Sequence, residues 1–201
     1  MSKIKICGIK SFQEIEYINE AQPDYIGFVF AKSRRCVDFH MAYLLKTELN
    51  PYIEAVGVFV NEDIDFIKKL CGLNVIDVVQ LHGDENHEYI DALKNVIDKP
   101  IIKAVRVKEK IDTIYSEISY PLFDTYNKEA YGGTGESFDW NMVRVYPKPF
   151  FLAGGLNIGN IANAINLVHP YCVDISSGVE INGVKDRQKI IEIVNLVRSI
   201  K

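Results

Sequence analysis

Residues 3–21 read KIKICGIKSFQEIEYINEA, and two hydrophobic periodicities follow one another in this stretch. KIKIC alternates apolar and polar residues, which indicates a β-strand over 3–7. FQEIEYINEA spaces its apolar residues three and four apart, which indicates an amphipathic helix over 12–21. Only the short GIKS segment separates the two, so the chain begins with a strand–turn–helix unit.

The same alternation recurs along the whole chain, with a repeat of about 25 residues. Each predicted strand is followed by a helical pattern or by enough chain to form a helix. Strands are predicted over 3–7, 24–30, 54–60, 77–81, 100–105, 120–124, 149–154 and 172–176. The clearest helices are predicted over 12–21, 63–72, 88–97, 161–168 and 186–200.

This alternation predicts parallel strands joined by helical crossovers, the α/β class. Eight units in 201 residues lie at the lower size limit of a (β/α)8 TIM barrel. A doubly wound sheet of five or six strands is the alternative, but it leaves two or three predicted strands unexplained. The sequence has no linker or low-complexity tract, so we expect residues 1–201 to form a single (β/α)8 barrel catalytic domain.

The composition restricts the classes of partner. With 48% hydrophobic residues the chain can bury one substantial core, and its net charge of −4 argues against general affinity for nucleic acid. The four cysteines form no C-x-x-C pair, and the histidines lack zinc-site spacing, so we expect free thiols and no metal. Without a signal-peptide core or an apolar run near ~18 residues, we expect a soluble cytoplasmic protein that does not bind membranes.

Three glycine-rich segments follow the last three predicted strands: GGTG (132–135), AGGLNIGN (153–160) and SSGVE (176–180). Glycine lets backbone N–H groups approach an anion, and barrels often bind phosphate between the loops after strands 7 and 8. One such loop alone is more often a tight turn, but three together favour a site for a small phosphorylated molecule. Neither G-x-G-x-x-G nor a P-loop occurs, which disfavours a dinucleotide or nucleoside triphosphate. The candidate phosphate ligands are Gly133, Gly154, Gly155, Ser177 and Gly178.

Strand parity predicts which side chains face the barrel axis. Lys5 and Cys7 share one side of strand 3–7, and Asp174 lies on the corresponding side of strand 172–176. The first and last strands of a closed barrel are neighbours, so we predict that Lys5 contacts Asp174 in the interior. Their charges would then act on Cys7, which lies at the end of its strand.

Cys7 and Asp124 are the candidate proton carriers. Asp124 ends strand 120–124, across the barrel mouth, where an enclosed carboxyl group can donate a proton. Cys7 can accept one as an accessible thiolate. Singly, a buried cysteine is usually an apolar filler and an aspartate at a strand end is often a helix cap. Together, opposite a phosphate site, they favour an aldose–ketose isomerisation that requires no metal or redox cofactor.

Other polar residues fall near the same rim. Gln80 and His82 share parity and are expected to line the barrel floor, with His82 as a hydrogen-bonded core residue. Arg34 and Arg35 follow the second strand. Solvated surface positions are one interpretation of this pair, and a guanidinium fork that binds a carboxylate at the rim is the other. Trp140 is interpreted as a packing residue between the sixth helix and the barrel.

Seven motifs, in chain order from residue 5 to residue 186, resemble one family: KICGI, GFVFAKSRR, VGVFVN, VQLHG, GGTGESFDW, LAGGLNIGN and VDISSGVEINGVKD. The resemblance is to the phosphoribosylanthranilate isomerases of tryptophan biosynthesis. It implies an Amadori rearrangement without a cofactor. In that reaction N-(5-phospho-β-D-ribosyl)anthranilate becomes 1-(2-carboxyphenylamino)-1-deoxy-D-ribulose 5-phosphate.

The resemblance also implies a role for each matching residue. It makes Cys7 the general base, Asp124 the general acid and Arg35 the ligand of the anthranilate carboxylate, with phosphate held by the loops after strands 7 and 8. Arg34 is a departure, since some members carry proline there.

Two rival functions remain at this point. A related phosphosugar isomerase of histidine biosynthesis, or a bifunctional form, typically uses two aspartates, so Cys7 favours the anthranilate substrate. A non-catalytic binder of a phosphorylated metabolite would not need Cys7 and Asp124 together. The sequence leaves open whether the chain is a monomer or a homodimer.

Overall fold

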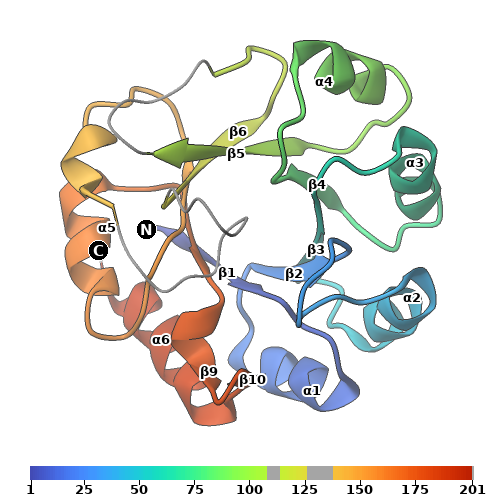
Figure 1. The fold of residues 1–201 in the computed structure, drawn as a ribbon. Helices are drawn as coiled ribbons and strands as arrows, with labels where there is room; N and C mark the ends of the chain where they lie inside the picture. Colours follow the sequence, from blue (N-terminus) through green and yellow to red (C-terminus); the bar gives the residue numbers. More distant parts are fainter. Residues whose placement is uncertain (108–113, 126–137, 201) are drawn as a thin grey trace.

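The computed structural model describes residues 1–107, 114–125 and 138–200. Eight parallel strands close into a barrel in chain order, and helices surround it (Figure 1), which confirms the predicted fold. The barrel strands are β1 (Lys3–Cys7), β2 (Tyr25–Val29), β3 (Glu54–Phe59), β4 (Val78–Leu81), β5 (Ile101–Val107), β6 (Tyr120–Thr125), β7 (Phe151–Leu152) and β8 (Cys172–Ile175). The α-helices of the described ranges are α1 (Phe12–Ala21), α2 (Phe39–Glu48), α3 (Ile64–Gly72), α4 (His87–Lys94), α5 (Ile161–Val168) and α6 (Arg187–Ser199).

Five of the six α-helices in the described ranges begin with a side chain that caps the first turn, and α5 is the exception. Ser11 accepts from the Glu14 N–H while the Glu14 side chain accepts from the Ser11 N–H, a reciprocal capping box at the start of α1. Four other helices start after a capping Asp or Asn: Asp38, Asp63, Asn86 and Asp186. The helix predictions for 12–21 and 161–168 coincide with α1 and α5.

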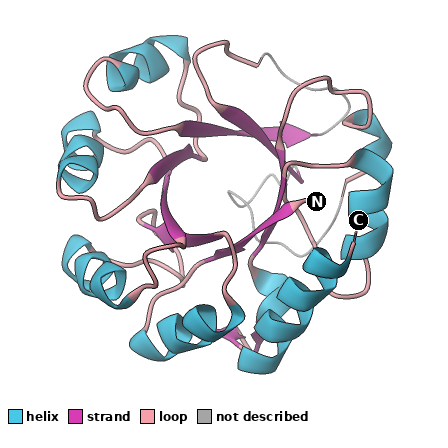
Figure 2. Ribbon diagram, turned by 180° about the vertical axis from the view of Figure 1, so that it is seen from behind, coloured by secondary structure: helices cyan, strands magenta, loops and turns pink. Residues whose placement is uncertain are grey.

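Figure 2 shows the ring of strands inside the ring of helices. The apolar side chains form two layers, one between the strands and the helices and one inside the barrel. Ile4 and Ile6 face outward and pack with the helices in the larger layer. The side chains inside the barrel form a separate cluster, which includes Tyr25, Val56, Val78, Ile102, Leu122, Phe151 and Cys172. Burying one large aliphatic side chain contributes about 1.5–3 kcal/mol, so these layers supply most of the driving force for folding.

The end of the barrel where the strands begin is filled by aromatic rings. Tyr120 and Tyr171 stack with their centroids 4.8 Å apart, and both lie against Phe151. The Lys3 ammonium group lies 5.0 Å from the centroid of the Tyr25 ring. This packing contributes to stability and leaves the opposite end of the barrel for the site.

The structure differs from the sequence-based expectation between β6 and β7. In the described residues 138–150, a single turn of 3₁₀ helix, Trp140–Met142, takes the place of the expected sixth helix. Trp140 is nevertheless buried in the outer apolar layer, so its packing role is confirmed. The strand predicted over 149–154 is shorter and spans Phe151–Leu152. Gly154 and Gly155 have positive φ angles, which exclude them from the extended conformation at its C-terminal end.

Within the described part of the chain, no helix is both long and apolar enough to cross a lipid bilayer.

Candidate active site

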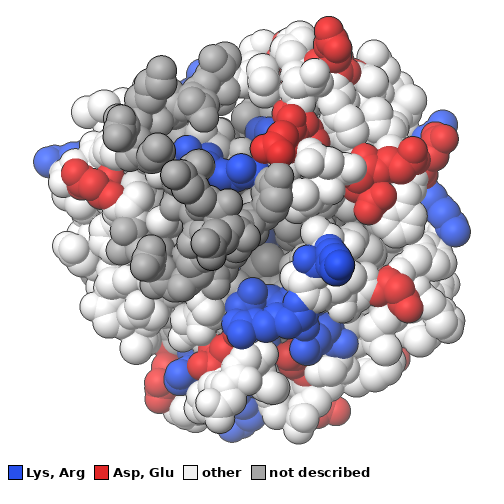
Figure 3. Space-filling view, in the orientation of Figure 1, with Lys and Arg blue, Asp and Glu red and all other residues white. Residues whose placement is uncertain are grey.

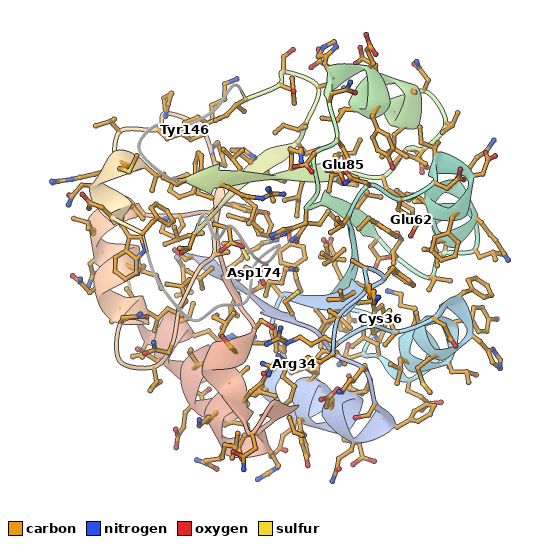
Figure 4. All side chains as sticks on the ribbon, in the orientation of Figure 1. Arg34, Cys36, Glu62, Glu85, Tyr146 and Asp174 are labelled. Carbon is orange, nitrogen blue, oxygen red and sulfur yellow. The ribbon has the colours of Figure 1, made fainter. Side chains whose placement is uncertain are left out.

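A cavity of about 610 Å³ opens at the end of the barrel where the strands finish. This volume is typical of small-molecule sites, and in TIM barrels this end carries the chemistry. The cavity brings together most of the predicted site residues: Cys7, Arg35, Asp124, Gly154, Gly155, Asp174 and Ser177. Figure 4 shows Asp174 near the centre of the ring and Arg34 toward the rim on the side of α1.

Two predicted phosphate ligands stand apart from this set. Gly133 lies outside the described residues. Gly178 is absent from the cavity wall. A Cβ atom there would collide with the backbone carbonyl oxygen of Leu156, so this glycine lets the loop after β8 lie directly on the loop after β7.

Cys7 ends β1 and presents its thiol to the cavity. Gly27 on the neighbouring strand leaves room for it, since a Cβ there would lie 2.6 Å from Sγ. Burial raises the pKa of the Cys7 thiol, and the positive charges of Lys5 and Lys185 offset this rise only in part. Cys7 is therefore mostly a thiol near neutral pH, and its thiolate fraction grows as the pH rises.

Lys5 is fully buried beneath Cys7 and forms the predicted pair with Asp174, with 2.8 Å between Nζ and Oδ2. Its ammonium group also donates to Gln80 Oε1 over 2.9 Å. Burial alone would lower the pKa of Lys5, but Asp174 and Cys7 outweigh it and raise the pKa, so Lys5 stays cationic. Since a buried ion pair is a costly way to fill a core, its position beside Cys7 suggests a role in the site.

Asp124 is buried near the end of β6 and held at both carboxylate oxygens. Oδ1 accepts from the Thr125 backbone N–H over 2.8 Å, and Oδ2 lies 3.2 Å from His82 Nε2. Gly154, with φ +88°, lies so close that a Cβ would be 3.0 Å from Asp124 Oδ1 and would collide with the Thr125 side chain. Only glycine combines this φ angle with this close approach.

His82 is the residue whose importance the sequence analysis missed. It is hydrogen-bonded at both ring nitrogens, as expected of a core histidine, but its ring lines the cavity and one partner is Asp124. Parity with Gln80 places His82 inside the barrel. Nothing in the sequence indicates that it reaches across to β6.

Arg35 is held at the rim by a charged cluster. Its Nε and Nη2 bind the two oxygens of Glu180 at 2.7 and 3.0 Å, a bidentate pair. Arg34 Nη2 and Lys185 Nζ each lie 2.8 Å from the same carboxylate. The Arg35 stem lies over Gly8, where a Cβ would collide with it. The fork is therefore fixed in direction before any ligand binds.

A small hairpin brings the partners of Arg35 together. It joins β9 (Glu180–Ile181) to β10 (Val184–Lys185), and the register pairs Lys185 with Glu180. Asn182 and Gly183 have φ angles of 52° and 81°, as two-residue hairpin turns require. The Asn-Gly dipeptide is a recognised hairpin signal that could have been used to predict this element.

The charged cluster of Glu180 with Arg34, Arg35 and Lys185 should stabilise the fold by an amount that depends on pH. Burial alone would raise the pKa of Glu180, but hydrogen bonds from Arg35 and Lys185 outweigh it and lower the pKa from 4.5 to about 2. A lowered pKa means stabilisation that is complete above pH 4.5 and is lost as the pH falls toward about 2. Urea unfolding should show Glu180→Gln less stable than wild type by roughly 2–3 kcal/mol at pH 7, with a smaller difference at pH 3.

Glu20→Gln is the control, because Glu20 pairs with Arg187 on the exposed surface. This variant should change stability little at either pH. An equal loss for Glu180→Gln at both pH values would contradict the ionic explanation.

The mouth of the cavity is basic. Lys32 and Arg35 belong to its wall, and Arg34 is largely exposed beside it. Figure 3 shows a group of Lys and Arg side chains just below the centre of this face. Such a field attracts an anionic ligand although the whole chain is acidic.

One group of potential metal ligands occurs among the described residues. His87, Asp91 and Glu117 place their ligand atoms within 4.8 Å of one another. His87 is exposed and already lies within ion-pair distance of both carboxylates, and none of the three residues lines the cavity.

Comparison with known proteins identifies relatives over nearly the whole chain. Residues 4–196 match the family described as N-(5′-phosphoribosyl)anthranilate (PRA) isomerase. A relative from Endomicrobium trichonymphae named N-(5′-phosphoribosyl)anthranilate isomerase is 52% identical over 200 residues, covering 100% of both chains.

Two solved structures have the same fold, each with 33% sequence identity over 99% of this chain and 100% of its own. One, with a TM-score of 0.83, is a phosphoribosyl anthranilate isomerase in complex with reduced 1-(o-carboxyphenylamino)-1-deoxyribulose 5-phosphate. The other, with a TM-score of 0.82, is described as mutually generated monomers of the dimeric enzyme from Thermotoga maritima. Both by sequence and by fold, the chain belongs to the N-(5′-phosphoribosyl)anthranilate isomerase family.

Proposed function

We propose that Cys7 and Asp124 carry the two proton transfers by which this chain isomerises N-(5′-phosphoribosyl)anthranilate. One observation supports these roles above all. A thiol, a carboxyl group, a fixed guanidinium fork and two glycine-rich loops line a single cavity of about 610 Å³. Acid, base and two anion sites are what a general acid–base isomerisation of a phosphorylated, carboxylated sugar requires.

Asp124 acts first, as the general acid. It donates a proton to the furanose ring oxygen while the bond from that oxygen to C1′ breaks. The lone pair of the anthranilate nitrogen forms the new double bond to C1′, which gives a protonated Schiff base. The Thr125 N–H then stabilises the carboxylate that Asp124 leaves behind.

Cys7 acts second, as the general base. Its thiolate removes the proton from C2′, and the electrons of that C–H bond form the C1′–C2′ double bond of an enolamine. The positive charge on the Schiff base nitrogen is neutralised in the same step, and the enolamine tautomerises to the ketone. Lys5 remains cationic beneath Cys7 and stabilises the thiolate.

The two ends of the substrate would be held by two different groups of residues in the cavity wall. Because Glu180 takes Nε and one N–H of Nη2, Arg35 would bind the anthranilate carboxylate through its remaining N–H groups on Nη1 and Nη2. Backbone N–H groups of the loops that carry Gly154, Gly155 and Ser177 would bind the phosphate. The ligand of the related solved structure carries a carboxyphenyl group and a 5-phosphate, the two groups that these residues suit. The phosphate role of Gly133 stays a prediction, and Gly178 supports these loops by close packing.

Asp174 offers one more contact. Its Oδ2 is bound to Lys5, whereas its buried Oδ1 has no hydrogen-bond partner among the described residues. Since Asp174 lines the cavity, we propose that Oδ1 accepts a hydrogen bond from a substrate hydroxyl group.

The rival functions are not favoured. The family match and the names of the relatives indicate the anthranilate substrate, not the related aminoaldose of histidine biosynthesis. A non-catalytic binder is disfavoured for the same reason.

A substitution of Arg35 tests the proposed orientation of the substrate. Arg35→Lys keeps the charge but loses the two-pronged donor, so KM should rise roughly 10- to 100-fold while kcat changes less. Steady-state kinetics with the natural substrate measure both constants. The phosphoribosyl derivative of aniline, which lacks the carboxylate, should bind wild type and variant alike. A variant that weakens both ligands equally would contradict the assignment.

Domain organisation, oligomeric state and cellular location complete the description of the chain. We propose that residues 1–201 act as one catalytic domain, since the barrel uses elements from β1 to α6. The Thermotoga maritima relative is described as dimeric, and light scattering decides between monomer and homodimer for this chain. The cytoplasmic location stays a prediction from the sequence.

A further inference from the structure

A line of hydrogen bonds crosses the barrel floor from Lys5 to Asp124. Lys5 Nζ lies 2.9 Å from Gln80 Oε1, and Gln80 Nε2 lies 3.0 Å from His82 Nδ1. His82 Nε2 then lies 3.2 Å from Asp124 Oδ2. All four side chains are buried, so each contact replaces solvation that the group has lost.

The chemistry of Lys5 fixes the direction of every bond in this line. An ammonium group only donates, so the Gln80 atom that faces it must be the carbonyl oxygen. The Gln80 amide nitrogen therefore faces His82 and donates, which makes His82 Nδ1 the acceptor. A neutral imidazole with an accepting Nδ1 carries its proton on Nε2 and donates from there to Asp124.

We propose that Gln80 is a positioning residue that holds His82 in the Nε2-protonated tautomer, so that His82 cannot take the proton of Asp124. The proposal rests on the proposed role of Asp124 as the general acid. With Nε2 already protonated, the proton on Asp124 can leave only toward the cavity, where the ring oxygen of the substrate would lie.

The opposite tautomer shows why the direction matters. If His82 carried its proton on Nδ1, Nε2 would present a lone pair to Asp124 and could accept the acidic proton. The result would be an imidazolium–carboxylate pair with no acid to offer the substrate. Lys5 cannot reverse the line, because Asp174 holds the same ammonium group over 2.8 Å and keeps it charged.

The tautomer can be read directly by ¹⁵N NMR of histidine-labelled protein, because protonated and unprotonated imidazole nitrogens differ widely in chemical shift. The spectrum of His82→Gln identifies the His82 signals by their loss. His40, His87 and His169 are exposed and serve as internal references. We expect an unprotonated Nδ1 and a protonated Nε2 for His82. A protonated Nδ1 in the wild-type protein would overturn the proposal.

Gln80→Glu should reverse the tautomer of His82, and it changes the shape of the side chain very little. A carboxylate accepts from Lys5 but cannot donate, so it attracts a proton to His82 Nδ1. The Nδ1 signal should move to the protonated range, and kcat should fall roughly 10- to 100-fold with KM nearly unchanged. An unmoved Nδ1 signal, or a kcat within about twofold of wild type, would contradict the positioning role.

Two further variants keep the test decisive. If Gln80→Glu fails to fold, Gln80→Met removes the donor without adding charge, and the His82 signals should then show both tautomers. His82→Gln offers an amide N–H to Asp124 but cannot take its proton, so kcat should stay within about 10-fold of wild type. A larger loss would mean that His82 itself transfers a proton.

Gln13→Glu is the matched control, since it makes the same chemical change at an exposed position of α1. It should leave the His82 signals and kcat as in the wild type.

Failure of the proposed function would be detected by a different measurement, the activity of the wild-type chain. A wild-type chain that is inactive on phosphoribosylanthranilate would remove the role of Asp124, whereas the NMR result judges the tautomer by itself.

Discussion

Cys7→Ala should lower kcat at least ~100-fold, and up to about 10⁴-fold, because the variant lacks the base that removes the C2′ proton. KM should change only a few-fold, since Arg35 and the phosphate loops remain in place. Stopped or continuous assays of phosphoribosylanthranilate consumption measure the loss. In a tryptophan auxotroph that lacks this isomerase, the wild-type gene should restore growth and the variant should not.

Cys71→Ala is the control for the loss of a buried sulfur. Cys71 is buried on α3, away from the cavity, so its replacement should cost roughly 1 kcal/mol of stability and leave kcat unchanged. A Cys7→Ala variant that turns over within a few-fold of wild type would show that Cys7 is not the base.

The wild-type enzyme should also become faster as the pH rises above neutrality. The pKa of Cys7 is raised by burial, so the reactive thiolate is the minor form at pH 7 and increases with pH. This alkaline increase in kcat/KM should be absent from the residual activity of Cys7→Ala.

Asp124→Asn is the second change with a large expected effect. An amide has nearly the same shape but no acidic proton, so ring opening should slow by about 10²–10⁴-fold. Binding of the reduced product analogue should persist, because neither anion site is altered. Isothermal titration with that analogue and steady-state kinetics separate the two effects.

Asp98→Asn is the control, since Asp98 is an exposed carboxylate outside the cavity wall. It should have wild-type kinetics. If Asp124→Asn instead lost the analogue and kept its kcat, the carboxyl group would be a binding group and the acid would have to be sought elsewhere.

The sequence was sufficient to predict the barrel and the faces of its strands. The alternation of side chains along β1 predicted that Lys5 and Cys7 face the barrel axis. Closure of the barrel then made β1 and β8 neighbours. The Lys5–Asp174 contact follows from these two steps and is present in the structure. Such predictions succeed because pleat and strand order are local or topological properties.

Contacts across the barrel could not be predicted in the same way. Parity places His82 inside, but whether its ring meets Asp124 depends on the distance between β4 and β6, which no local pattern encodes. The pairing of Arg35 with Glu180 has the same difficulty, since it joins segments 145 positions apart. Here a signal was available, because Asn182-Gly183 predicts the hairpin that presents Glu180.

The expected sixth helix illustrates a different limit. Trp140 was placed correctly in the outer apolar layer, but its segment forms a 3₁₀ turn. An apolar anchor with polar neighbours is compatible with either conformation, so burial was predictable and backbone geometry was not.

The most direct measurement is a crystal structure of this chain with reduced 1-(o-carboxyphenylamino)-1-deoxyribulose 5-phosphate. We predict Cys7 Sγ on one side of the ribulose chain, about 3–3.5 Å from C2′, and an Asp124 oxygen on the other side, near the former ring oxygen. Arg35 should hold the carboxylate, and the loops after β7 and β8 the phosphate. A complex with either group on the wrong side of the sugar, or out of reach of it, would contradict the acid–base pair.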